Sequence, residues 1–201
     1  MALRKLWSSV VPDRAAYTWV FLLLATSVSL GACGGPSANL PYLPPADTAA
    51  YRLGPGDQIR IITVGGQELT GEFRIGADGN IAVPMVGNVA ASGLTPVQLG
   101  GTLSTRLRQT GLIKNPSVSV EVVAYRPIFV LGEVSRPGQF PFEPGSTVVT
   151  AVAVAGGFTY RAIKNDFSVV RTVNGRAIEG RAQRQTFLQP GDVLTVYERR
   201  F

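Results

Sequence analysis

The single cysteine of this 201-residue chain, Cys33, lies where a specific covalent modification is expected. It follows Leu30-Gly31-Ala32, and an apolar run that begins at Ala15 precedes these residues. Basic residues stand before the run, which is the layout of a secretory signal. Leucine, two small residues and cysteine resemble a bacterial lipobox, in which the thiol receives a diacylglyceryl group and cleavage makes it the new N-terminus. The sequence therefore predicts a signal peptide over residues 1–32 and lipid attachment at Cys33.

The apolar run has a second interpretation, an uncleaved transmembrane anchor that leaves Cys33 as an incidental thiol. From Ala15 to Leu30 the run is shorter than the ~20 residues that a spanning helix needs, although it approaches the lower limit of ~17. Hydroxyl residues within it also reduce its apolar character. Length and flanking residues favour the lipoprotein, with the rest of the chain outside the cytoplasm.

The residue types that usually carry catalysis are scarce. Histidine is absent, which removes the commonest general base and metal ligand. One cysteine excludes an internal disulfide and a cysteine-based zinc site. No phosphate-binding loop occurs, and the acidic residues are dispersed, with Glu68 and Glu72 the nearest approach to a carboxylate pair. We therefore predict a protein that is not an enzyme and that uses no cofactor or metal.

The charge of the chain is basic, with a formal net charge of +6. Residues 126–201 contain ten basic and six acidic residues, so the excess lies in the C-terminal half. A basic surface suits acidic polymers or phospholipid headgroups. The basic residues are scattered, and no arginine-rich helix with interleaved aromatic residues occurs. We therefore predict no nucleic-acid partner.

The residues after Cys33 divide into a linker and a first folded unit. Residues 33–50 are rich in proline and lack periodicity, so we expect an extended linker, with order beginning at Tyr51. We expect the first unit over residues 51–125, with a hairpin at Asp78-Gly79-Asn80 and a helix that Thr95 caps and Gly111 ends. Alternating apolar residues predict strands at 58–61 and 118–122.

We expect a second unit over residues 126–201. Its predicted strands are 128–134, 139–142, 167–171 and 193–196, and a helix from Ser146 or Thr147 to Ala155 lies among them. Asn174-Gly175 predicts a hairpin turn. With the first unit, this predicts an α+β protein of two small β-rich domains.

A Leu-x-Pro-Gly-Asp turn occurs in both units, at Leu53 to Asp57 and at Leu188 to Asp192. Each turn precedes a predicted strand. An aspartate after Pro-Gly usually accepts hydrogen bonds from nearby backbone amides. We therefore assign Asp57 and Asp192 a structural role, and the shared spacing alone is weak evidence of duplication.

The order of these motifs resembles a known family. Tyr51-Arg-Leu-Gly-Pro-Gly-Asp-Gln-Ile59, Gly76-Ala-Asp-Gly-Asn-Ile-Ala-Val-Pro84 and Asn115-Pro-Ser-Val-Ser-Val120 are similar to the polysaccharide export domain of Wza-like outer-membrane lipoproteins. Val130 to Phe140, with Ala155-Gly-Gly-Phe158 and Pro190-Gly-Asp192, resembles the soluble-ligand-binding β-grasp (SLBB) domain that follows it. The resemblance covers residues 51–201.

The resemblance implies a lipoprotein of the outer membrane that faces the periplasm and forms a homo-oligomeric ring through which a capsular polysaccharide or exopolysaccharide is exported. Its implied partners are the polysaccharide and an inner-membrane copolymerase or assembly complex. Family members of the Wza kind carry further SLBB domains and a C-terminal membrane helix, but this sequence reaches Phe201 without either. We therefore expect a separate outer-membrane channel.

The residues leave an alternative open: a monomeric periplasmic lipoprotein that binds a glycan or small ligand through its SLBB domain. A polysaccharide-modifying hydrolase is disfavoured by the absence of histidine and by the scattered carboxylates. A DNA-binding β-grasp domain would reveal itself by binding that weakens as salt rises.

Overall fold

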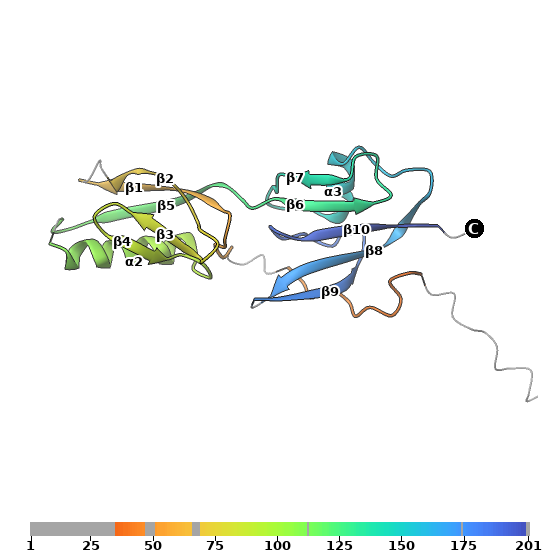
Figure 1. Ribbon diagram of the computed structural model, residues 1–201, viewed down its shortest axis with the longest axis horizontal. Coiled ribbons are helices and arrows are strands. Elements are labelled where there is room, and N and C mark those ends of the chain that lie inside the picture. Colours follow the sequence, from red (N-terminus) through yellow and green to blue (C-terminus); the bar gives the residue numbers. More distant parts are fainter. Residues whose placement is uncertain (1–34, 47–50, 66–68, 112, 174, 200–201) are drawn as a thin grey trace, which may run out of the picture. The chain divides into compact units, whose positions relative to one another are not determined.

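The computed structural model describes residues 35–46, 51–65, 69–111, 113–173 and 175–199. These residues form two β-rich domains with separate hydrophobic cores, and each domain contains one α-helix (Figure 1). The predicted α+β class is confirmed. Among the described residues, no helix is both long enough and apolar enough to cross a bilayer.

The first domain is built on a three-stranded antiparallel sheet in the order β2-β1-β5. In β1, alternate residues are buried, with Ile59 and Ile61 facing the core, as expected for a strand with one face covered. A two-stranded β3–β4 hairpin adds a second layer. The strands are β1 (Gln58–Val64), β2 (Gly71–Arg74), β3 (Asn80–Val83), β4 (Gly87–Ala90) and β5 (Ser117–Ala124).

The prediction that strands on either side of Asp78-Gly79-Asn80 pair as a hairpin is wrong, although the turn itself is present. Gly79 has a positive φ of 81° and its N–H donates to the Gly76 carbonyl. Strand β2 pairs with β1, however, and β3 pairs with β4. The backbone of Ile75 forms hydrogen bonds with Asp57 and Gly56. The residue that follows β2 is therefore held against the turn before β1. Strand β3 therefore finds its partner in β4, across a turn that contains Met85 at φ 63°.

Helix α2 (Pro96–Gln109) confirms the predicted capping box, because Thr95 and Gln98 bond reciprocally through side chain and backbone. Its leucines at 99, 103 and 107 are all buried. Gly100 lies against β5, where an added Cβ would stand 2.9 Å from the Val118 carbonyl oxygen. The helix can therefore approach the sheet only because residue 100 has no side chain.

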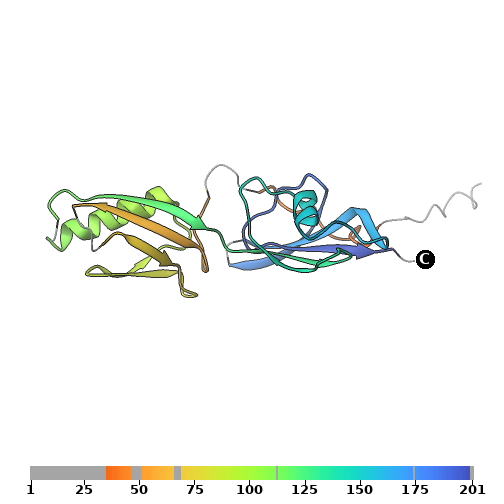
Figure 2. The same ribbon diagram turned by 90° about the horizontal axis from the view of Figure 1, so that it is seen from above.

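The second domain is a five-stranded mixed sheet in the order β7-β6-β10-β8-β9 (Figures 1 and 2). Strand β10 runs parallel to β6 and antiparallel to β8, and β8 pairs antiparallel with β9 up to Val173 and Arg176, the residues that flank the predicted hairpin turn. Its strands are β6 (Ile128–Gly132), β7 (Gly138–Phe140), β8 (Ala162–Val173), β9 (Arg176–Ala182) and β10 (Val193–Glu198).

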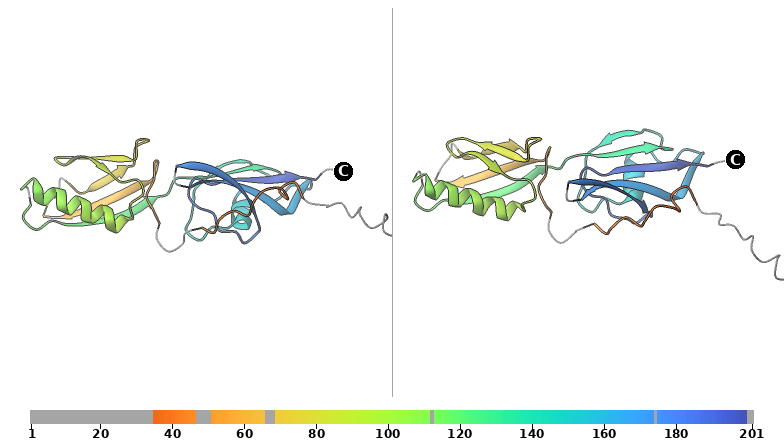
Figure 3. Two further views of the ribbon diagram at one scale, coloured as in Figure 1. Left: turned by 90° about the horizontal axis from the view of Figure 1, so that it is seen from below. Right: turned by 60° about the horizontal axis from the view of Figure 1, so that its bottom comes forward.

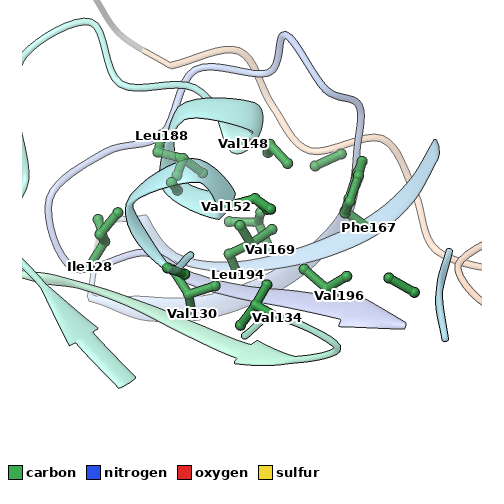
Figure 4. Close-up of a cluster of buried hydrophobic side chains, with 14 of the residues drawn as sticks. Ile128, Val130, Val134, Val148, Val152, Phe167, Val169, Leu188, Leu194 and Val196 are labelled. Atoms are coloured by element: carbon green, nitrogen blue, oxygen red, sulfur yellow. The ribbon is translucent and has the colours of Figure 1, made fainter. Parts of the chain in front are cut away.

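Helix α3 (Val148–Val154) covers one face of this sheet. Thr147 caps it, and Gly156 and Gly157, both at positive φ, follow its end as predicted. Figure 4 shows the resulting core, in which Val148 and Val152 of α3 pack toward side chains from the strands below. The strand residues of this core are Ile128, Val130, Ala162, Phe167, Val169, Ala182, Leu194 and Val196.

Candidate functional site

The predicted lipid attachment site, Cys33, lies outside the described residues. The first described residues after it, 35–46, were expected to be a linker without order before Tyr51, and this expectation is wrong. Ser37 and Leu43 are buried, and the segment forms hydrogen bonds with the second domain. We call residues 35–46 the strap.

One end of the strap is fixed by Asp166 of β8. The backbone N–H of Ser37 donates to Asp166 Oδ2 at 3.0 Å, and the Ser37 hydroxyl donates to Asp166 Oδ1. Arg181 of β9 also donates to Asp166 Oδ1, at 3.0 Å. Burial would raise the pKa of Asp166, but the hydrogen bonds from Ser37 and the charge of Arg181 together hold that pKa below its usual value. The carboxylate is therefore ionised at neutral pH and holds the strap.

The middle of the strap extends the sheet beyond β9. The Arg181 N–H donates to the Pro41 carbonyl at 2.7 Å, and the Leu43 N–H donates to the Arg181 carbonyl at 2.9 Å. Tyr42 is exposed and lies over the Arg181 guanidinium, 5.9 Å from ring centroid to Cζ. Leu43 turns into the core beside Gly180, where an added Cβ would stand 2.7 Å from its Cα. The strap thus covers an otherwise open sheet edge.

The far end of the strap meets a buried ion pair. Arg171 and Asp192 are each about 2% exposed in their side chains, and Arg171 Nη2 lies 2.7 Å from Asp192 Oδ2. Arg171 also donates to the carbonyls of Pro44 and Phe187. Burial raises the pKa of Asp192, and the hydrogen bonds from Arg171 oppose that rise. Because Arg171 donates to both the strap and the loop before β10, it fixes the separation between them.

The two Leu-x-Pro-Gly-Asp turns use their aspartates in the same way. Asp57 accepts from the N–H of Gly54 at 2.8 Å, and Asp192 accepts from the N–H of Gln189 at 2.7 Å. These hydrogen bonds, each between residues three apart in the turn, confirm the structural role predicted for both aspartates. Each carboxylate also binds one arginine, Arg126 or Arg171, which the sequence did not reveal.

Arg126 connects the two turns. Its backbone N–H donates to Asp57 Oδ1 at 2.9 Å, and its Nε donates to the Pro190 carbonyl at 2.9 Å. Tyr51 donates its hydroxyl to Asp57 Oδ2 at 2.5 Å, and burial together with this carboxylate raises the pKa of Tyr51. Tyr51 therefore stays protonated and acts as a hydrogen-bond donor.

The exposed side of helix α2 lines a wide, open hollow of about 710 Å³. Its lining includes Gln98, Arg106 and Gln109, whose amides and guanidinium can contact hydroxyl groups. The hydroxyls of Thr102 and Thr105 also line it but donate to helix carbonyls. Within the described part of the chain, no three histidine, cysteine or acidic side chains gather as a metal site.

Two known protein families match the two domains of this chain separately. The polysaccharide biosynthesis/export protein family matches residues 45–123, and the SLBB domain matches residues 127–182. The chain belongs to the polysaccharide export family. The export domain is thus the domain built on β1, β2 and β5, and the SLBB domain is the one that carries the strap.

Similar proteins carry names from polysaccharide production and export. The exopolysaccharide production protein ExoF of Rhizobium meliloti (strain 1021) is 33% identical over 148 residues, which is 68% of this chain and 33% of that protein. The capsule polysaccharide export outer membrane protein CtrA of Neisseria meningitidis is 30% identical over 134 residues, 62% of this chain and 33% of CtrA. The polysialic acid transport protein KpsD of Escherichia coli is 27% identical over 109 residues, 53% of this chain and 19% of KpsD. This export-family chain therefore spans a third or less of the length of these relatives.

Sequence reasoning missed the strap and its partners. One signal was available: Leu40, Tyr42 and Leu43 stand among prolines, and apolar side chains in an extended segment suggest docking onto a surface. Asp166, Arg171 and Arg181 carried no comparable signal, because their partners lie far away in the sequence. Ser37, for example, is 129 residues from Asp166.

Proposed function

We propose that this protein is a lipid-anchored component of a capsular polysaccharide or exopolysaccharide export machine, placed at the outer membrane and facing the periplasm. The observation that carries the proposal is the match of a polysaccharide export domain and an SLBB domain in consecutive parts of one chain. Relatives named as export or transport proteins of polysaccharides support it. The protein handles the polymer without chemical change and is not an enzyme.

The anchor in this proposal is Cys33, acylated after removal of residues 1–32. The Leu-Gly-Ala-Cys sequence supports it, as does the apolar run before it. Two or more acyl chains on one residue are sufficient for stable attachment to a membrane. The mass of the N-terminal peptide of the mature protein tests this step, because an unmodified Cys33 would exclude the anchor.

The working form in this proposal is a homo-oligomeric ring. Phe129 and Leu131 on the outer face of β6 are 38% and 45% exposed, and such side chains gain free energy when a neighbouring copy covers them. Attachment to one membrane also raises the effective concentration of the copies. The ring would receive polysaccharide from an inner-membrane copolymerase or assembly complex and pass it to a separate outer-membrane channel.

The mass of the acylated protein in mild detergent tests the assembly. We expect one multiple of the subunit mass that persists on dilution, as for a closed ring. A monomer at concentrations found in the cell would contradict the ring, and it would support the alternative of a monomeric lipoprotein that binds a glycan or a small ligand. Phe129→Ser with Leu131→Ser should shift the mass toward the monomer, whereas Val97→Ser on α2 is the exposed apolar control.

A further inference from the structure

The end of the SLBB domain at which the strap begins carries exposed basic and aromatic side chains. Tyr160 is 85% exposed, and Arg161, Lys164 and Arg199 are exposed as well. The backbone N–H of Arg199 donates to the Arg161 carbonyl, and Glu198 pairs with Ala162 across β10 and β8. These contacts bring the start of β8 and the end of β10 together. We call Tyr160, Arg161, Lys164 and Arg199 the basic end.

The strap begins beside the basic end. Lys164 and Asp166 lie two residues apart near the start of β8, in the stretch where its pairing with β10 is irregular. Asp166 is the residue that holds Ser37. Figures 1 and 3 agree that the first described strap residues and the end of β10 lie at the same end of this domain. An acyl group on Cys33, two residues before Gly35, would therefore enter a bilayer within about 10 Å of Gly35.

The charges of the basic end favour an anionic surface. Two acidic side chains there already have arginine partners, since Glu198 pairs with Arg161 and Asp166 pairs with Arg181. A third, Glu133, accepts the hydroxyl of Thr159, a hydrogen bond that supplies no positive charge, so this carboxylate offsets one of the cations of the basic end. Lys164 and Arg199 form no ion pair within the part of the chain that the structure describes, and the sequence continues from Arg199 with a second arginine.

We propose that the basic end is a membrane-contact surface of the SLBB domain that binds anionic lipid headgroups. Lysine and arginine near a negatively charged leaflet gain electrostatic attraction, and tyrosine is favoured at the level of the headgroups. The strap sets the geometry, because it fixes the anchored end of the chain beside these residues. The placement against the membrane rests on the proposed acylation of Cys33. The affinity of the basic end for headgroups does not depend on that acylation.

The headgroup affinity is measured with a chain of residues 33–201 carrying Cys33→Ser, which has neither the signal peptide nor an acyl group. Its partition onto vesicles of phosphatidylglycerol and phosphatidylcholine in equal parts is compared with its partition onto phosphatidylcholine alone. We expect binding to the anionic vesicles that weakens as salt rises. Lys164→Gln should lower the partition about fivefold, the effect of one basic residue near an anionic surface. Lys114→Gln, an equal change of charge at an exposed position of the export domain, is the control and should leave it unchanged.

Equal partition onto both vesicles, or equal losses from the two lysine variants, would overturn the proposal. Binding of an acidic glycan that Lys164→Gln abolishes, with no vesicle binding, would instead assign the basic end to the polymer and would also overturn it. A bare Cys33 in the mature protein would remove the anchor but not salt-dependent vesicle binding. The failure of the anchor and the failure of this surface are therefore distinguishable.

The contact in the anchored protein is tested with a label. An acylated Cys33 has no free thiol, so Tyr160→Cys introduces one reactive thiol into the native lipoprotein. A fluorophore there should be quenched by lipids with a quencher in the headgroup. Val97→Cys is the control, because Val97 is also 85% exposed but belongs to the export domain. Equal quenching at the two positions would contradict a surface specific to the basic end.

Discussion

At the scale of the residue, two buried carboxylates determine how the turns before β1 and β10 close. Asp57 and Asp192 are 0% and 1% exposed, and each binds a backbone amide three residues earlier in its turn. A buried carboxylate is tolerated only when it is paired and hydrogen-bonded, and here the arginines at 126 and 171 supply the charge. The repeated sequence motif thus forms the same hydrogen-bonded turn immediately before two different strands.

Asp192→Asn should destabilise the SLBB domain by about 3 kcal/mol, because it leaves the guanidinium of Arg171 buried without an anion. Urea unfolding followed by a probe in that domain measures the change. Glu72→Gln is the matched control, since the Arg60–Glu72 pair is about half exposed on both sides. The control should scarcely move the urea midpoint, and equal effects of the two changes would contradict this account of the pair.

Docking of the strap should depend on pH through Asp166. Its pKa is lowered in the folded protein, so the ionised form stabilises docking above the unfolded value of about 3.9, and this contribution is lost as the pH falls through the lower, folded value. Cleavage of the strap by pepsin in acid should therefore accelerate below about pH 4 relative to a loop of the export domain. In Asp166→Asn the strap should already be less protected at neutral pH, and a pH dependence that persisted in this variant would exclude Asp166 as its source.

At the scale of the element, the strap is an added edge strand whose fit depends on Gly180. Glycine is needed at position 180 for lack of space and not for a positive φ. Backbone atoms of Leu43 lie within 3 Å of the place that a Cβ would occupy. Alanine at 180 therefore cannot be accommodated without moving the strap.

Gly180→Ala should release the strap while leaving β8 and β9 paired. We expect faster amide hydrogen exchange at Leu43 and at Arg181, whose N–H groups form the two strap hydrogen bonds, and unchanged exchange in β1. Ala177→Gly, a change of one methyl group at an exposed position on the same strand, is the control. Unchanged exchange at Leu43 in Gly180→Ala would show that the strap is not held by close contact.

The adjacent glycines of α2 should respond to alanine in opposite directions. An added Cβ at Gly101 meets nothing within 4 Å, so Gly101→Ala should stabilise the export domain by about 1 kcal/mol through helix propensity. Gly100→Ala should destabilise it, because the Cβ would press on the Val118 carbonyl. Thermal unfolding of the two variants gives the signs, and a stabilised Gly100→Ala would refute the close approach of α2 to β5.

The elements were more predictable from sequence than their partners. Predicted capping residues, Thr95 and either Ser146 or Thr147, located both helices of the described residues, since a cap is a local interaction that the sequence displays directly. The partner of β3 was predicted incorrectly, because strand pairing depends on contacts that no local pattern records. The strap was missed for the same reason, since Asp166 and Arg181 lie far from Ser37 along the chain.

At the scale of the whole molecule, the chain combines an export domain with an SLBB domain that carries the strap. The order of the motifs identified the family, because several turns and strands in a fixed order are far more specific than any single turn. The strap gives the proposed anchor a definite origin on the SLBB domain.

The location of the polysaccharide in cells that lack the gene tests the proposed function most directly. Polymer outside the cells and polymer retained within them are each measured in the deletion strain, with and without the gene restored. We predict that external polymer falls sharply while polymer accumulates inside, and that the restored gene returns both to normal. Normal external polymer in a deletion strain without a second copy of the gene would contradict the proposal, and a loss of polymer from both fractions would place the protein in synthesis instead.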